Sequence, residues 1–361
     1  MTNRQVWSLA LGLLGVTPAG VASQENFGSS AAVLGNQVAV GQPANFYGPG
    51  AVYLFGVDDD GSWQEVGRLF SPDSAMADGF GRSISGTPER VLVGAPRDGG
   101  AGTAYLFQAP ASPAGDWTLL ARLPTVEGGG SEGFGSAVAL GGEAAIVGAP
   151  DAKEGGAVYV FDLSGGGSTQ VLEPNGMDGA GFGTALSVEE GVLVVGAPAA
   201  NGQAGAAIVY RRGDDGAWAR EAVLSPEGEA AGFFGAAVHI SDGRAFVGAP
   251  RGSRGIGAIA VYEQAGDGWT FQGRLTPEGA SPGAGFGTAV QTVAGEVWVG
   301  APGGGGGDGV VHRFSPESDG TWAHSGTVLA DSANTAAWPF GFGSAIASGE
   351  EVAVVGMPRR D

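Results

Sequence analysis

A Phe-Gly pair that begins the same short series of motifs recurs seven times along the 361-residue chain. Successive copies are 48 to 56 residues apart. The phenylalanines are Phe27, Phe80, Phe134, Phe182, Phe234, Phe286 and Phe342. A near-constant period of this length indicates a repeat architecture, in which one small unit is copied along the chain.

Each unit is built from up to four short blocks. After the Phe-Gly block, the second block reads VAVGQP, VLVGAP, AIVGAP, LVVGAP, AFVGAP, VWVGAP or VAVVGMP. Six units add a third block such as GAVYLF, and five of these add a fourth that runs from a tryptophan to a leucine; the third unit has STQVLEP instead. Because the blocks are rich in β-branched and aromatic residues and are separated by Gly, Asp, Asn and Pro, they predict strands joined by tight turns.

The turns support antiparallel strands in chain order. Asp-Gly pairs such as Asp60-Gly61 and Asp319-Gly320 stand just before the tryptophans, and they supply the positive φ that tight hairpins need. Four strands per unit, repeated radially, predict an all-β fold, a seven-bladed β-propeller of four-stranded antiparallel blades. We expect residues 25–361 to form this single propeller, with repeats starting near residues 27, 80, 134, 182, 234, 286 and 342.

Residues 1–24 have two interpretations. Arg4, the uncharged apolar stretch 6–16 and the small residues 21–23 are typical of a secretory signal peptide. Alternatively, Trp7 precedes Phe27 by the same 20 residues that separate Trp322 from Phe342, which predicts an outer strand that closes the ring. The seventh unit contains only the first two blocks, so such a strand would supply one of its missing partners.

The order Phe-Gly, short strand, V-G-A-P, G-A-V-Y-x-F and tryptophan strand resembles the FG-GAP repeat family of integrin α chains and bacterial extracellular proteins. The resemblance covers residues 27–358. It implies a secreted or cell-surface adhesion or binding module, often with calcium in a D-x-D-x-D-G loop between the first two strands. The loops at that position, such as LGNQ and SVEEG, lack alternating carboxylates, so we expect neither calcium nor another cofactor there.

Motifs for metal binding or catalysis are weak. Asp58, Asp59 and Asp60 form the densest acidic cluster, but they fall in a predicted hairpin, where a solvated turn is the simpler interpretation. The three histidines fall in strands and lack metal-ligand spacing. Because no nucleophile or phosphate-binding motif is present, we expect no catalytic residues and a non-enzymatic protein. A propeller enzyme with a site in the central channel is the third hypothesis for function.

The amino-acid composition limits the classes of partner that the protein can have. With 37 acidic and 17 basic residues the formal net charge is −20, which argues against nucleic-acid binding. The chain has no cysteine, which excludes disulfides and thiolate sites, and no apolar run long enough to span a membrane. We expect a monomer whose partner is a protein or a glycan.

The loops before Phe-Gly and after Gly-Ala-Pro should lie at one end of the blades, since antiparallel strands alternate in direction. Rigid scaffolds commonly present ligand-binding residues on such loops. The candidate ligand residues are Phe46, Tyr47, Arg97, Lys153, Arg251, Arg254 and Trp338. They predict a partly basic face for an acidic glycan or a protein. The alternative is that the loops merely carry solvated charges, on a structural display domain or a fragment of a larger surface protein without its own ligand.

The repeated motif itself is interpreted as structural. We expect Phe182 to fill the wedge between two blades, and Gly196 and Pro198 to end the second strand, since proline cannot donate to a sheet.

Overall fold

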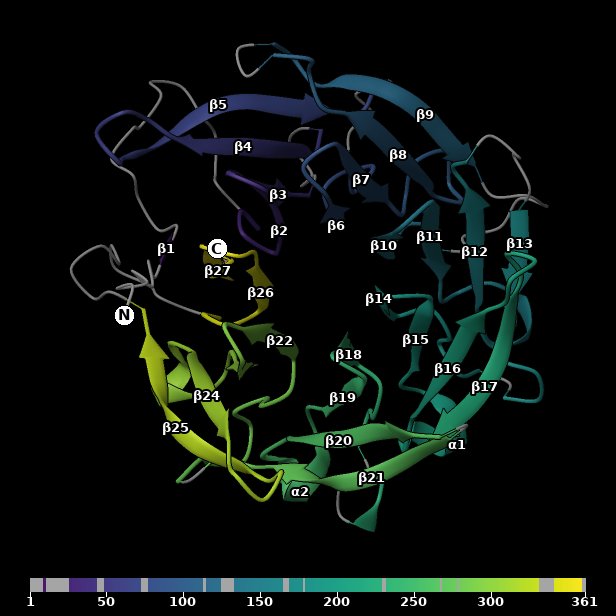
Figure 1. The fold of residues 1–361 in the computed structure, drawn as a ribbon, viewed down its shortest axis with the longest axis vertical. Helices are drawn as coiled ribbons and strands as arrows, with labels where there is room; N and C mark the ends of the chain where they lie inside the picture. The colour runs from purple at the N-terminus through teal and green to yellow at the C-terminus, as the bar shows by residue number, and fades with distance from the viewer. Residues whose placement is uncertain are drawn as a thin grey trace.

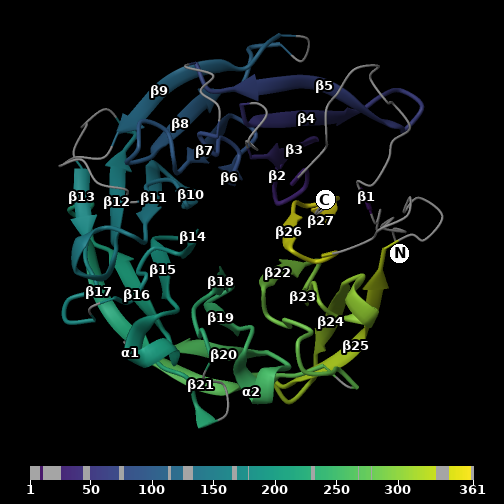
Figure 2. The same cartoon turned by 180° about the vertical axis from the view of Figure 1, so that it is seen from behind.

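The fold is a β-propeller, in which sheets are arranged radially around one axis (Figures 1 and 2). The computed structural model describes residues 9–10, 26–43, 49–72, 77–112, 115–124, 133–164, 169–177, 179–228, 232–266, 268–277, 279–330 and 341–358. Within these residues the helical segments are single turns: η1 (Lys153–Gly155), α1 (Ala200–Gln203), α2 (Gly252–Gly255) and η3 (Gly305–Gly307).

Six blades have four antiparallel strands each, which follow one another in chain order from the axis outward. Blade 1 contains β2 (Ser30–Leu34), β3 (Gln37–Gln42), β4 (Ala51–Val57) and β5 (Trp63–Phe70). Blade 2 contains β6 (Ser83–Gly86), β7 (Arg90–Ala95), β8 (Thr103–Gln108) and β9 (Thr118–Pro124). Blade 3 contains β10 (Ala137–Gly141), β11 (Ala144–Ala149), β12 (Ala157–Asp162) and β13 (Thr169–Leu172).

The next three blades repeat this order, so each of the first six units forms one blade from its four blocks. Blade 4 contains β14 (Ala185–Glu189), β15 (Val192–Ala197), β16 (Ala206–Arg212) and β17 (Trp218–Leu224). Blade 5 contains β18 (Ala237–Ser241), β19 (Arg244–Ala249), β20 (Ala258–Ala265) and β21 (Gly268–Leu275). Blade 6 contains β22 (Ala289–Val293), β23 (Glu296–Ala301), β24 (Val310–Pro316) and β25 (Trp322–Leu329).

The prediction of seven four-stranded blades is corrected to six. The seventh unit forms a three-stranded sheet of β26 (Ala345–Ser348), β27 (Ala353–Gly356) and β1 (Leu9–Ala10). Only β26 and β27 are antiparallel, because this unit contains just the first two blocks; β1 pairs with β27 in parallel. This sheet lies between β22 and β2 (Figures 1 and 2). Apart from β1, residues 1–24 lie outside the described part, so the two interpretations of that segment stay predictions.

Glycines hold neighbouring units together through their backbones. In every unit, the second-block glycine lies so close to the next unit's Phe-Gly glycine that an added Cβ would be 1.9 to 2.2 Å from its carbonyl oxygen. The contact also joins the last unit to the first, between Gly356 and Gly28. The strand β15 ends at Ala197, directly before Pro198 as we expected, but contrary to our expectation Gly196 lies inside the strand. It pairs with Ala207 inside β15, and it is glycine because no side chain fits there.

Phenylalanine fills the space between sheets. Phe182 is fully buried, in a cluster with Ile146 and Val158 of blade 3 and Leu193 of blade 4. This confirms its expected place in the wedge between blades. The Phe-Gly phenylalanines of units 2 to 7 are all 0% exposed.

Polar side chains connect the innermost strands of adjacent blades. Ser85 Oγ accepts a hydrogen bond from the Leu140 N–H at 3.0 Å, and Ser187 Oγ accepts one from the Ile240 N–H at 3.1 Å. At the corresponding place in blade 5, His239 Nε2 accepts from the Thr292 N–H at 3.1 Å. The accepting nitrogen must be unprotonated, and burial lowers the pKa of His239 to about 4. His239 is therefore a structural histidine that replaces a serine.

The glycine contact predicts a large loss of stability in Gly248→Ala. The new Cβ would lie 2.2 Å from the Gly287 carbonyl oxygen, so backbone must move against backbone. We expect the free energy of unfolding, measured by urea titration, to fall by about 3 kcal/mol. Gly268→Ala is the matched control, because an added Cβ there meets no atom within 4 Å. Equal, small effects of both substitutions would contradict the proposed role of the contact.

The lowered pKa of His239 predicts that the free energy of unfolding decreases as the pH falls. The unfolded imidazole binds its proton near pH 6.5, but the folded one only near pH 4, so the unfolded state gains protons first as pH decreases. Between pH 7.5 and pH 5 this should remove about 2 kcal/mol of unfolding free energy. His239→Ser keeps an acceptor without the titration, so its stability should decline less over the same range. A parallel decline in both proteins would show that His239 is not responsible.

Candidate functional site

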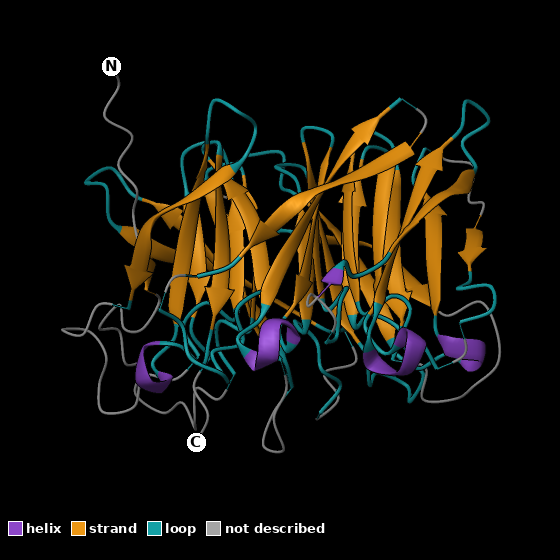
Figure 3. Ribbon diagram, turned by 90° about the horizontal axis from the view of Figure 1, so that it is seen from below, coloured by secondary structure: helices purple, strands orange, loops and turns teal. Residues whose placement is uncertain are grey.

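One face of the propeller carries the loops that follow the second strands. Figure 3 shows all four helical turns on the same side of the strands. In blades 2 to 6 this loop ends at a glycine with positive φ, which forms a parallel bridge with the phenylalanine of the next unit: Gly102 with Phe134, Gly156 with Phe182, Gly205 with Phe234, Gly257 with Phe286 and Gly309 with Phe342. The loops before Phe-Gly therefore meet the loops after Gly-Ala-Pro. We call this side the loop face.

The predicted ligand residues are only partly visible on it. Arg97, Arg251 and Arg254 are exposed on the loop face. Only the backbone of Lys153 is described, in η1, and Phe46, Tyr47 and Trp338 lie outside the described residues. Arg251 and Arg254 belong to the same loop in blade 5, whereas Arg97 lies in blade 2 on the opposite side of the ring (Figure 1). Within the described part, these three arginines do not form one cluster.

Arg251 is held by an aromatic ring. Its guanidinium lies 4.5 Å from the centroid of the Phe233 ring, which belongs to the loop before Phe-Gly. The Arg251 N–H also donates to the Gly232 carbonyl at 3.3 Å. A cation over an aromatic face is attracted by the ring quadrupole, so Arg251 fastens the two loops of blade 5 to each other.

Arg254 adopts a backbone conformation that favours glycine. Its φ is +60°. Four positions after the corresponding proline, blades 4 and 6 have Gly202 and Gly306, with φ of +67° and +84°, and blade 3 has Glu154, with φ of +62°. A residue with a side chain in this region carries a strain of about 1 kcal/mol. The neighbouring Ser253 is left-handed as well, with φ of +47°. Glycine would therefore have less backbone strain than arginine at this position.

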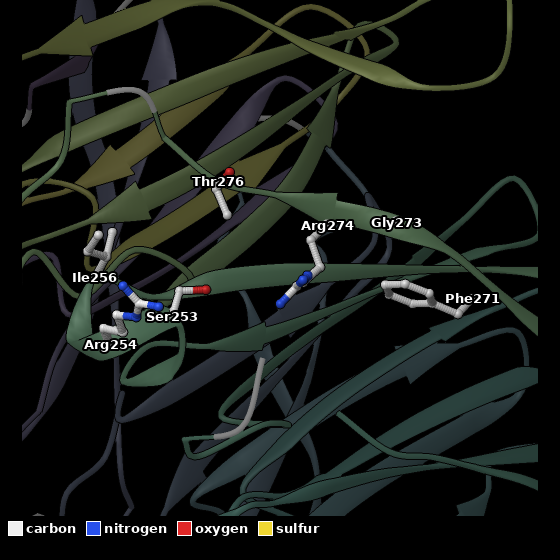
Figure 4. A pocket seen from close by; sticks show the side chains of 7 residues that line it. All are labelled: Ser253, Arg254, Ile256, Phe271, Gly273, Arg274 and Thr276. Carbon is white, nitrogen blue, oxygen red and sulfur yellow. The ribbon is translucent and has the colours of Figure 1, made fainter. Parts of the chain in front are cut away.

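Arg254 lines a surface pocket of about 670 Å³. The pocket lies between the α2 loop and the outer strand β21, and its lining residues are Ser253, Arg254, Ile256, Phe271, Gly273, Arg274 and Thr276. In the view of Figure 4, the Arg274 side chain lies between the α2 loop and Phe271. Sequence reasoning missed Arg274, because it considered loop residues only and the outer strand supplies this second guanidinium. Two cations, one aromatic ring and two hydroxyl groups can bind an anionic, partly apolar ligand.

A second polar cluster is buried in blade 2. Asp78 and Asp98 are 2% and 5% exposed, at positions where blade 4 buries Ala180 and Ala200. Asp98 Oδ2 accepts from the Tyr105 hydroxyl and, at 3.1 Å, from Arg122 Nη2. Asp78 Oδ1 accepts from the Phe80 N–H at 2.9 Å, and Asp78 Oδ2 has no hydrogen-bond partner among the described residues. Burial, opposed by backbone hydrogen bonds and assisted by the charge of Asp98, raises the pKa of Asp78.

The Asp58–Asp60 cluster closes a hairpin turn. Asp58 Oδ1 accepts from the Ser62 N–H at 2.9 Å, and Asp60 Oδ1 accepts from the same N–H at 2.9 Å. Hydrogen bonds from Ser62 and Asp58 lower the pKa of Asp60, which is fully exposed. Among all described residues, no group of three or more His, Asp or Glu side chains has the geometry of a metal site.

The structure also brings two histidines together, which their sequence spacing did not predict. His312 Nδ1 of β24 lies 3.2 Å from His324 Nε2 of β25. Burial, together with the charge that His324 would carry, lowers the pKa of His312 to about 4. His312 also packs edge-on against Phe286, at 5.4 Å between ring centroids. The pair is thus part of the packing of blade 6.

Solved structures show a similar fold. A crystal structure of a proposed 6-phosphogluconolactonase from Bacteroides uniformis matches with a TM-score of 0.56 and 13% identity, over 77% of this chain and 78% of that one. The neighbour corrects our expectation of a non-enzymatic protein, since a propeller of the same general fold is named as an enzyme. At this identity the likeness shows the fold alone. No curated protein sequence matches the chain.

In the described part, no helix has the length and apolar character needed to cross a membrane. A propeller of FG-GAP repeats is compatible with a binding or a structural module. The FG-GAP repeat family matches residues 63–107 and 117–161, so the predicted resemblance is confirmed there and the chain carries FG-GAP repeats.

Proposed function

We propose that the protein is a binding module that holds an acidic glycan on its loop face, with the pocket of Arg254 and Arg274 as the anchoring site. The observation that carries this proposal is the pair of guanidinium groups lining one pocket, from the α2 loop and from β21. Arginine donates two parallel hydrogen bonds to a carboxylate or a sulfate, which suits uronic acids and sulfated sugars.

The pocket also offers an apolar surface. Phe271 and Ile256 line it together with Ser253 and Thr276. The C–H groups of a sugar ring could pack against the two apolar side chains, and its hydroxyl groups could hydrogen-bond to the two polar ones. The net charge of −20 gives the rest of the chain a negative field that repels polyanions. A locally positive pocket on such a chain favours a ligand that docks at one place over one that spreads across the surface.

The left-handed Arg254 supports the same function. Glycine would relieve the backbone strain at this position, as it does in blades 4 and 6. A strained conformation that persists at a pocket is a pointer to a role for the side chain. Arg254 is thus the residue whose replacement best separates binding from stability.

Arg254→Gly should weaken binding without destabilising the fold. We expect the Kd for heparin or polygalacturonate, measured by calorimetry, to rise about 10-fold, because one charge-assisted contact is lost. The unfolding free energy should stay constant or rise by up to about 1 kcal/mol.

Arg220→Ala is the control, since it removes one exposed positive charge from β17 and Arg220 does not line the pocket. It should change the Kd less than 2-fold on the proposed mechanism. An equal rise in Kd in both variants would show that binding depends on the total positive charge and not on the pocket. Failure of the unmodified protein to bind any acidic glycan would favour a protein ligand, or a display domain without a ligand of its own.

We also propose that the chain is exported, as a secreted or cell-surface protein. FG-GAP repeats are typical of extracellular proteins, and residues 1–24 have the charged start, apolar centre and small residues of a signal peptide. Expression of the full sequence should release a protein shortened near Ser23, as measured by intact mass. A cell-retained protein with an intact N-terminus would contradict export.

A further inference from the structure

The two outer strands of blade 6 bring together two of the three histidines in the chain (Figure 1). In the antiparallel register, His312 of β24 lies opposite Thr327 of β25. His324 of β25 lies opposite Phe314, which is two residues further along β24. Because residues two apart on a strand face the same side of the sheet, His312 and His324 share one face of blade 6.

His312 occupies the place that a tyrosine has in blades 1 to 3. The third block reads GVVHRF in blade 6, whereas it reads GAVYLF, GTAYLF and GAVYVF in those blades. The rings of Tyr53, Tyr105 and Tyr159 pack edge-on against the Phe-Gly phenylalanine of their own unit, at 5.2 to 5.6 Å between centroids. His312 packs in the same way against Phe286, at 5.4 Å. This packing explains an aromatic ring at the position, but it does not explain an imidazole.

The residue opposite this position also differs in blade 6. In blades 1 and 2 it is an arginine. The Arg68 guanidinium lies 4.6 Å from the centroid of the Tyr53 ring, and Arg122 lies in the same way over the ring of blade 2, at 5.8 Å. In blade 6 the residue is the uncharged Thr327. A guanidinium would repel a cation bound beside it, and blade 6 has a hydroxyl group there instead.

The two histidines are spaced like the ligands of one metal ion. His312 Nδ1 lies 3.2 Å from His324 Nε2. An ion at the usual distance of about 2.0 to 2.1 Å from both nitrogens would have an N–metal–N angle of about 100°, which is close to tetrahedral. Burial, together with the charge that His324 would carry, lowers the pKa of His312 to about 4, so this ring is neutral at pH 7. A hydrogen bond between the rings is the other interaction that this distance allows.

We propose that His312 and His324 form a binding site for one divalent transition-metal ion, with Zn²⁺ as the ion that best fits the angle. Imidazole nitrogen suits Zn²⁺, Cu²⁺ and Ni²⁺, whereas Ca²⁺ and Mg²⁺ require oxygen ligands. Among the described residues, no third His, Asp or Glu side chain completes a metal site with this pair, so water fills the remaining positions and the ion is exchangeable. The half-buried His324 and the exposed Thr327 leave the site open to solvent.

The test measures Zn²⁺ binding by calorimetry, with the full chain carrying no histidine tag and with excess Mg²⁺ to occupy surface carboxylates. We expect one Zn²⁺ per chain. His312→Tyr introduces the residue that blades 1 to 3 have at this place, and His324→Gln keeps a polar side chain, so both variants should fold. Each should raise the Kd at least about 10-fold. His239→Ser is the matched control, because it removes the third histidine, from β18, and it should leave the Kd unchanged.

Nuclear magnetic resonance of the histidine ring nitrogens gives a second measurement on the unmodified protein. With three histidines in the chain, the same three substitutions assign the signals. Zn²⁺ should shift the signals of His312 and His324 and leave those of His239 in place.

Three results would overturn the proposal. One is the absence of binding heat up to about 1 mM Zn²⁺. Another is an equal Kd for the unmodified protein and both pair variants, which would mean that carboxylates bind the ion. The third is an unchanged set of ring signals for His312 and His324, which would leave the hydrogen bond as their only interaction.

Discussion

The ring depends on one contact between backbones. The glycine of each V-G-A-P block lies against the carbonyl of the next unit's Phe-Gly glycine, too close for any side chain. The same Phe-Gly glycine donates its N–H to the second-block glycine of its own unit, as Gly235 does to Gly248 at 2.9 Å. Each unit is thereby fixed to itself and to its neighbour by main-chain atoms. The phenylalanine then fills the wedge that this close approach leaves, and the hydrophobic clusters between blades form around it.

Because the ring contacts use little side-chain chemistry, the outer surfaces can differ from blade to blade. Blade 2 buries a carboxylate pair where blade 4 has two alanines, and blade 5 carries a left-handed arginine where blade 4 has glycine. Neither difference changes the strand order. The positions that distinguish one blade from another can therefore vary without disturbing the ring, and in blade 5 they coincide with a pocket.

The sequence predicted the propeller, the strand order within a blade and the common loop face, because each depends on a local period repeated many times. It did not predict why Gly196 is glycine, since the reason is a contact with Gly235 in the next unit. Three other features were missed for the same reason. They are the proximity of Asp78 to Asp98, the contact of His312 with His324 and the position of Arg274 beside the α2 loop. These depend on how loops and outer strands meet in space. The expectation of a seventh four-stranded blade extended the period past the blocks that the seventh unit contains.

The glycine contact also bears on how such a chain can change. A side-chain interface is specific to its two partners, so an altered residue on one side usually needs a matching alteration on the other. The backbone contact is made by the same two glycines at every junction, including Gly356 with Gly28. It is therefore not specific to one pair of units. The glycine contact does not restrict which units can be neighbours, whereas the side-chain clusters between blades do. Exchange of whole units therefore leaves this contact intact, whereas replacement of a single glycine removes it.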